Sequence, residues 1–283
     1  MSPIVIASGG WEARIRPDIG GALATLSKDG RQMLRPMPDI ASDVRDSACF
    51  AMLPFSNRIA GAQFEWDGRT VSLEPDMLAY PHALNGTGWQ VPWEVEVATT
   101  DTAILCHHHE RDTQGWPWAF RAQLQYSVSG EGLAVLLSMT NLSSSPMPAG
   151  LGLHPYLRRS SQTSVRFEAE EVVLTDADGI PTGESASPGR FAQWAQGAEL
   201  PNVLVDHCHT GWTGTAEVSD HFGTVTLQAE GAPHLHIYAP PESGVLCCEP
   251  VSHRPNALNQ FAQDVIVLKP GETQSLTLRI GHR

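Results

Sequence analysis

The chain has 283 residues, of which 41% are hydrophobic and 17% charged, and its formal net charge is −13. This composition is typical of a folded globular protein, and the acidic balance argues against binding to the phosphates of nucleic acids. No apolar run approaches the roughly 18 residues of a membrane span, and the N-terminus lacks the pattern of a signal peptide, so we expect a cytoplasmic protein with no membrane partner.

Alternation of polar and apolar residues, which indicates half-buried strands, recurs along the whole chain. It is found in residues 11–17, 63–75, 93–99, 120–130, 132–142, 215–231, 234–240 and 275–281. Short turns rich in Gly, Asp and Asn join several of these segments, and helical periodicity is nearly absent except that residues 184–197 could hold a short helix. We therefore predict an all-β fold, a large antiparallel β-sandwich, in a single domain that covers residues 1–283.

The five cysteines are predicted to be reduced and mostly buried. Their number is odd and their spacing matches no disulfide framework, and the adjacent pair at positions 247 and 248 would face opposite sides of a strand. The five are Cys49, Cys106, Cys208, Cys247 and Cys248.

The first candidate for binding is the turn that contains Asn57 and Arg58, just before a predicted strand. A guanidinium group carries five donors, which suits the hydroxyl groups of a sugar or a carboxylate. The alternative is an arginine on a solvated loop or in a structural ion pair.

A loop punctuated by glycines follows, with His82, Asn85, Trp89 and Trp93. Aromatic faces beside polar donors suit a carbohydrate, whose C–H faces are apolar and whose edges are polar. The alternative is that these aromatic residues simply belong to the core.

His154 ends an apolar run and precedes Pro155. Its imidazole could donate or accept a proton near neutral pH. Because a proline cannot donate to a sheet, we expect the strand to end or bend at Pro155 and to expose the ring at a rim. The alternative is an ordinary structural histidine.

Three clusters of histidines raise the question of a metal site: residues 107–109, residues 206–209 and the pair His234 and His236. Adjacent side chains in a strand face opposite ways, and the pair on one face has no identifiable third ligand. We therefore predict no metal and no other cofactor.

Glu249 follows a short apolar strand, so its carboxylate would project from the end of that strand. Partial burial would raise its pKa and let it act as a general base. The alternative is a solvated surface glutamate.

Six stretches, taken in order, resemble the aldose 1-epimerase (mutarotase) family. They are SNRIAG from residue 56, HALNG from 82 with PW downstream, GWPWAFRAQLQYSV from 115, GLHPYL from 152, VDHCHTGW from 205 and EPVSHRPNALNQ from 249. The resemblance covers nearly the whole chain. It implies a β-supersandwich and an isomerase that interconverts the α and β anomers of a free monosaccharide without a cofactor.

The resemblance also implies roles for particular residues. His154 stands at the position of the general acid and Glu249 at that of the general base, while Arg58 and Asp206 stand where the sugar is bound. Asn85 stands where the family usually has a histidine, so substrate identity is open at this point. His82, three residues earlier, is a candidate for the missing imidazole.

Two alternative functions remain at this point. One is a carbohydrate-binding or sugar-sensing protein on the same fold that has lost catalysis, which the asparagine at position 85 favours. The other is an epimerase for hexose 6-phosphates, which would need clustered basic residues, and the only adjacent pair is Arg158 and Arg159.

Overall fold

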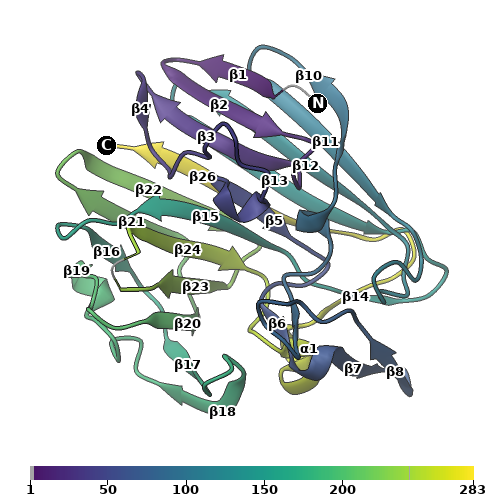
Figure 1. Cartoon of the computed structure of the whole chain (residues 1–283). Coiled ribbons are helices and arrows are strands. Elements are labelled where there is room, and N and C mark those ends of the chain that lie inside the picture. Colours follow the sequence, from purple (N-terminus) through teal and green to yellow (C-terminus); the bar gives the residue numbers. More distant parts are fainter. Residues whose placement is uncertain (1–2, 242) are drawn as a thin grey trace.

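The computed structural model describes residues 3–241 and 243–283, and it confirms the predicted all-β fold. Two large antiparallel sheets lie face to face (Figure 1). The alternation in the sequence explains this arrangement, because every second side chain of strands such as β12 (Phe120–Ser129) and β13 (Gly132–Asn141) enters the core. Strand β26 (Thr273–His282), from the C-terminal end of the chain, pairs with β13.

The larger sheet has eleven strands and carries the residues of interest. Its spatial order is β1 (Ile4–Ser8), β2 (Trp11–Arg16), β3 (Ala22–Lys28), β5 (Cys49–Met52), β15 (Gly152–Arg158), β24 (Val245–Val251), β23 (His234–Ala239), β20 (Val205–Thr210), β17 (Glu171–Thr175) and β18 (Pro181–Ala186), with β4 (Arg31–Gln32) attached to β3.

The second sheet has nine strands, and three small sheets of two strands complete the fold. The order in the second sheet is β10 (Glu94–Ala98), β11 (Thr102–His109), β12, β13, β26, β22 (Gly223–Glu230), β21 (Thr215–Asp220), β16 (Ser164–Phe167) and β19 (Ala198–Glu199). The small sheets are β14 (Met147–Ala149) with β25 (Ile266–Leu268), β6 (Arg58–Ile59) with β9 (Ala83–Leu84), and β7 (Gln63–Trp66) with β8 (Arg69–Ser72).

Helical structure in the described residues is limited to short turns. They are the α-helix α1 (Ala257–Gln260) and the 3-10 turns at Val44–Asp46, Ala60–Ala62, Gly88–Gln90, Trp194–Gln196 and Ala262–Asp264. The helix considered for residues 184–197 is only the turn at Trp194–Gln196, because the start of that stretch belongs to β18. No described helix has the length and apolar character that crossing a membrane requires.

The two faces of the larger sheet have different neighbours. One face packs against the second sheet and contributes Leu153, Leu235 and Cys248 to the main hydrophobic core. The other face carries a smaller apolar cluster that includes Phe50 and Cys247. Cys247 and Cys248 thus face opposite sides of β24, as predicted, and all five cysteines are buried and free. The candidate site lies on the face that carries the smaller cluster.

The expectation that β15 ends or bends at Pro155 is wrong. The strand continues to Arg158, and Pro155 is paired with Cys49 on β5. Pro155 has no N–H group to donate to the strand on the other side, β24, and pairing with β24 is interrupted between Gly152 and Tyr156. His154 therefore lies within a strand in the interior of the sheet and not at a rim.

Candidate active site

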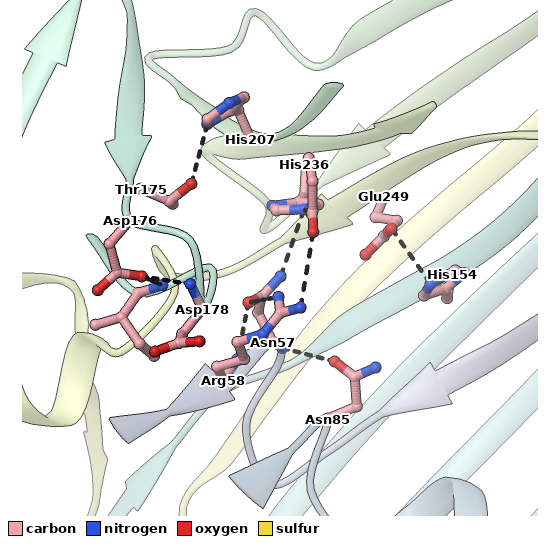
Figure 2. A network of polar contacts seen from close by, with 12 residues as sticks. Asn57, Arg58, Asn85, His154, Thr175, Asp176, Asp178, His207, His236 and Glu249 are labelled. Atoms are coloured by element: carbon pink, nitrogen blue, oxygen red, sulfur yellow. Dashed lines mark hydrogen bonds and ion pairs between the residues drawn. The ribbon is translucent and has the colours of Figure 1, made fainter. Parts of the chain in front are cut away.

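His154 and Glu249 lie side by side on two neighbouring strands of the larger sheet. The register that pairs Gly152 with Val251 places His154 on β15 opposite Glu249 on β24. The Nε2 atom of His154 is 3.3 Å from the Oε1 atom of Glu249, and Figure 2 shows the two side chains pointing toward one another. The antiparallel pairing of these strands therefore brings into contact two residues that are far apart in the sequence.

Aromatic rings surround the imidazole of His154. The ring of Phe50 on β5 stacks on it with centroids 4.5 Å apart, and the ring of Tyr156 lies 4.6 Å away. The side chain of His154 is 12% exposed and that of Glu249 only 4%. Both groups are thus largely removed from water, where burial disfavours their charged forms.

Burial shifts the pKa values of the two groups in opposite directions. Burial, helped by the positive charges of His236 and Arg35, lowers the pKa of His154 to about 3. Burial raises the pKa of Glu249 to about 7, although the charges of His236 and Arg58 oppose this shift. Between these two values the pair holds one proton, mainly on Glu249, and moving that proton across the contact gives the other tautomer.

A second pair of imidazole and carboxylate, His236 and Asp206, lies one strand further along the sheet. His236 on β23 is paired with Glu249 on β24, and its Nε2 atom is 2.7 Å from Oδ1 of Asp206. Burial is the largest influence on the pKa of His236 and works to lower it, but the hydrogen bond to Asp206, the thiol of Cys208 and the charges of Glu249 and Asp206 together outweigh burial and raise the pKa to about 10. Burial works to raise the pKa of Asp206, but His236 and Arg58 outweigh it and the pKa falls below its usual value. This second pair is therefore ionised at neutral pH.

The turn before β6 brings Asn57 and Arg58 to the second pair (Figure 2). The Nδ2 atom of Asn57 is 3.4 Å from Nε2 of His236, and Nη2 of Arg58 is 3.7 Å from Oδ2 of Asp206. The backbone N–H of Asn57 donates to Oδ1 of Asn85 at 2.7 Å. Both asparagines have a positive φ of 57°, which asparagine tolerates better than most residues. Three residues predicted to bind sugar, Arg58, Asn85 and Asp206, thus belong to one connected network.

Residues from the C-terminal motif hold this turn in place. The backbone N–H of Ser56 donates to Nε2 of His253 at 3.1 Å, and that of Ala60 donates to Oδ1 of Asn256 at 3.0 Å. The backbone N–H of Asn256 donates to the carbonyl of Arg58 at 2.8 Å. The motif that begins with the predicted general base therefore also positions the predicted sugar-binding arginine.

His82 and the two tryptophans of the loop have structural contacts. The Nδ1 atom of His82 accepts a hydrogen bond from the backbone of Gly61 at 3.0 Å, and its Nε2 atom is buried without a hydrogen-bond partner among the described residues. Trp89 and Trp93 are both buried, and their indole N–H groups donate to backbone carbonyls. Packing explains the tryptophans, whereas a sugar-binding role for His82 stays a prediction.

The sequence predicts no catalytic or sugar-binding role for His236, and for Asn57 only a place in the candidate binding turn, yet both belong to the site. The sequence signal for His236 is its spacing of two from His234, which puts both imidazoles on one face of a strand. His234 instead lies 3.5 Å from Asp264. The spacing does not tell which strand lies beside β23, so it could not place His236 next to Glu249.

Among the described residues, His154, Cys247 and Glu249 have donor atoms that all lie within 4.8 Å of one another. This set of nitrogen, sulfur and oxygen could hold a metal ion. Two of its three members are the candidate acid and base, and a bound metal would occupy the lone pairs that proton transfer needs. We therefore assign no metal to it.

Comparison with known proteins points to one family. The profile of a family described as aldose 1-epimerase matches residues 4–281. The Escherichia coli K12 protein YphB, whose name states no activity, is 27% identical in an alignment of 276 positions that covers 93% of each chain. A maltose epimerase of Levilactobacillus brevis is 24% identical over 70% of this chain and 62% of its own. The crystal structure of a candidate aldose 1-epimerase from Escherichia coli K12 matches with a TM-score of 0.91 and 26% identity, covering 100% of this chain and 99% of that one.

Proposed function

The chain belongs to the aldose 1-epimerase family, and on this basis we propose that it interconverts the α and β anomers of a free aldose. Glu249 and His154 are the general base and the general acid, the whole chain acts as a single domain, and no cofactor takes part. The observation that carries the proposal is the 3.3 Å contact between His154 and Glu249 on the face of the sheet that is not used by the main core.

Opening a pyranose ring requires two proton transfers at neighbouring oxygens. The base removes the proton of the C1 hydroxyl, the bond between C1 and the ring oxygen breaks, a C1 carbonyl forms, and the acid protonates the ring oxygen. Both oxygens are bonded to C1, so an acid and a base on adjacent strands can reach them from one side. Rotation about the C1–C2 bond and closure with the proton roles reversed give the other anomer.

The pair needs one proton to perform this cycle. Opening starts from a charged His154 and an ionised Glu249 and leaves a neutral His154 and a protonated Glu249, and closure restores the first state. Both are tautomers of the form that holds one proton. Because that proton is lost as the pH rises through about 7, we expect kcat/KM to fall above this value, after subtraction of the uncatalysed rate.

Arg58, Asp206 and Asn85 are proposed to bind the hydroxyl groups of the sugar, with His82 as a further candidate. Arg58 and Asp206 present charged donors and acceptors on the same side of the sheet as the reacting pair. Hydrogen bonds to charged groups contribute about 1.5–3 kcal/mol each, which suits a small polar ligand.

The alternative functions gain less support. Two of the five donors of Arg159 bond to the backbone carbonyls of Pro240 and Pro201, so the structure ties this guanidinium to the backbone and gives no sign of a phosphate site there. A protein that only binds sugar would need no titratable pair, yet both members of the pair are present and in contact. The observations therefore favour an enzyme for free sugars.

The test is NMR saturation exchange, or polarimetry, between the anomers of galactose, glucose, arabinose, xylose and their phosphates. Maltose belongs in the screen because one relative is named a maltose epimerase. We expect the wild-type protein to accelerate at least one free sugar, and His154→Asn and Glu249→Gln to reduce that acceleration by about 10²–10⁴-fold.

Circular dichroism and thermal unfolding of the two variants check that the fold is intact. Wild-type rates in either folded variant would contradict the assigned roles. Calorimetric binding of a sugar without any acceleration by the wild-type protein would instead favour the binding function.

A further inference from the structure

We propose that His236 is a positioning residue of this site: its imidazolium, held by Asp206, lies beside Glu249 and keeps that carboxyl group able to give up its proton. This inference rests on the proposed function for its consequence in catalysis, but its physical content concerns only the charge states of His236 and Glu249.

The geometry of the sheet places the two residues next to each other. In the register of β20, β23 and β24, Cys208 is paired with His236 and His236 with Glu249. His154 stands opposite Glu249 on the next strand. The four side chains therefore form one row across four adjacent strands, on the same face of the sheet, with the imidazole of His236 on one side of Glu249 and that of His154 on the other.

The imidazole of His236 is oriented by its hydrogen bond to Asp206. Its Nε2 atom donates to Oδ1 of Asp206 on β20 at 2.7 Å, while the Nδ2 atom of Asn57, itself a donor, packs 3.4 Å from the same nitrogen without accepting from it. The Oδ1 atom of Asn57 accepts from the backbone N–H of Arg58, which fixes the orientation of the amide. The ring is thus held in a single place and is only 4% exposed.

The charges around the row decide the protonation of its members. The titratable and charged groups around His236, Glu249 and His154 are Asp206, His207, Cys208 and His209 on β20, Tyr238 on β23, Cys247 and Cys248 on β24, Tyr156 on β15, Cys49 on β5, Arg58 on β6 and Arg35. Of these, His236 and Arg58 are the two cations that stabilise the ionised form of Glu249, against the burial of that carboxyl group.

A comparison along the same strand shows that the position of His236 is special. His234 lies on the same face of β23 and also contacts a carboxylate, since its Nε2 atom is 3.5 Å from Asp264. The residue paired with His234 on β24 is Val251, whereas the residue paired with His236 is Glu249. An ion pair needed only for stability could lie at the position of His234 or at that of His236. Only the position of His236 puts a cation next to Glu249, the candidate base.

Removing the cation should raise the pKa of Glu249. Two charges on adjacent strands, at an effective dielectric constant near 20, shift a pKa by about one unit or more. In His236→Gln we therefore expect the pKa of Glu249 to rise by about one unit, and the alkaline limb of kcat/KM to move to higher pH by the same amount. A loss of structural support alone would lower the rate at every pH and leave the limb in place.

The experiment measures the charge states directly. Difference infrared spectroscopy follows the carboxyl stretch of Glu249, assigned with Glu249→Gln, during a pH titration of the wild type, His236→Gln and His236→Lys. We expect the transition to move upward in His236→Gln and to stay near the wild-type position in His236→Lys, because the lysine restores the positive charge next to Asp206. His234→Gln is the matched control and should leave the transition where it is.

Two outcomes overturn the inference. One is a carboxyl transition in folded His236→Gln at the wild-type position, and the other is a neutral His236 imidazole, seen by ¹⁵N NMR of the wild-type protein, in the pH range where Glu249 titrates. The NMR measurement decides the question even if His236→Gln does not fold. A wild-type protein that accelerates no sugar would refute the proposed function and leave these titrations, and hence the inference on charge, unaffected.

Discussion

Two pairs of histidine and carboxylate lie one strand apart in this sheet, and they differ in charge. His154 and Glu249 are 3.3 Å apart with side chains 12% and 4% exposed, whereas His236 and Asp206 are 2.7 Å apart with side chains 4% and 22% exposed. In the first pair burial dominates and favours neutral groups. In the second pair the hydrogen bond and the neighbouring charges together outweigh burial and favour ions.

The difference shows that the neighbours of a buried group decide its charge as much as its burial does. Asp206 has a hydrogen bond from His236 and a guanidinium 3.7 Å away, which compensate for its removal from water. Glu249 has no hydrogen bond of comparable quality in the described structure, so it keeps a pKa near 7. A histidine beside a carboxylate thus gives a fixed charge in one place and a mobile proton in the other.

The largest effect on stability is expected from Asp206→Asn, which breaks the ionised pair. Removing one partner of a buried ion pair costs about 3 kcal/mol or more. The pKa of His236 is raised, so its stabilisation is fully present below its ordinary value near 6.5 and is lost as the pH rises through about 10. Urea unfolding should therefore show a deficit for Asp206→Asn that is large at pH 6 and shrinks toward pH 10.

Glu96→Gln provides the matched control for this substitution. Glu96 also contacts a cation at 2.7 Å, Arg121, but the two side chains are 36% and 32% exposed. An exposed pair contributes about 0–1 kcal/mol, so the deficit should be small. An equal loss of unfolding free energy in Asp206→Asn and Glu96→Gln would show that burial does not strengthen the pair of His236 and Asp206.

The fold of this chain could be predicted because its sheets follow directly from a local pattern. Strands such as β12, β13 and β26 bury every second residue, and the turn of Asp67 and Gly68 joins β7 to β8 as such a dipeptide should. The error at Pro155 has a physical reason. A proline removes one donor only, and β15 keeps its pairing to β5 on the other side.

The site could be predicted only as far as the resemblance identified residues one by one. His154 and Glu249 lie in contact, but the sequence alone gives no register between β15 and β24, and the register sets that contact. His236 was visible as one of two histidines spaced by two, without any indication that Glu249 lies beside it. Strand order and register result from the packing of the whole chain. A local sequence pattern therefore cannot predict which side chains lie next to each other on neighbouring strands.

The opposite sign of effect on stability is expected for Glu249→Gln. The pKa of Glu249 is raised from its ordinary value near 4.5 to about 7, so the native state loses stability as the pH rises between these values, where the buried carboxyl group must ionise. The amide carries no charge, and the variant should be more stable than the wild type by about 1–3 kcal/mol at pH 8. Denaturant unfolding at pH 8 measures this gain.

The same variant at pH 4.5 provides the internal control, because the carboxyl group is protonated there in the native protein and the gain should nearly vanish. A more stable but inactive variant would be the expected pattern for a group kept for function at the expense of stability. Destabilisation at pH 8 would mean that Glu249 is held by an interaction that compensates for its burial, and the contrast between the two pairs would be lost.

The smallest expected effect comes from displacing the guanidinium of Arg58, which lies beside the ionised pair of His236 and Asp206. A substitution at Gly179 can displace it. A Cβ atom at Gly179 would lie 2.7 Å from Cζ of Arg58, whereas one at Gly183 meets no atom within 4 Å. Both glycines have a positive φ, 77° and 87°, so alanine costs about 1–2 kcal/mol of stability at either site.

Only Gly179→Ala should move the guanidinium away from Asp206. We expect its KM for the sugar to rise about threefold to tenfold, the loss of part of one charged hydrogen bond, with kcat nearly unchanged. Gly183→Ala should lose similar stability and keep the wild-type KM, as steady-state kinetics and thermal unfolding of the two variants would show. Arg58 lies against Asp206, whereas His154 and Glu249 contact each other. A change confined to KM would show that Arg58 and Asp206 serve binding and that His154 and Glu249 alone carry the reaction. A fall in kcat alone would contradict this division of roles.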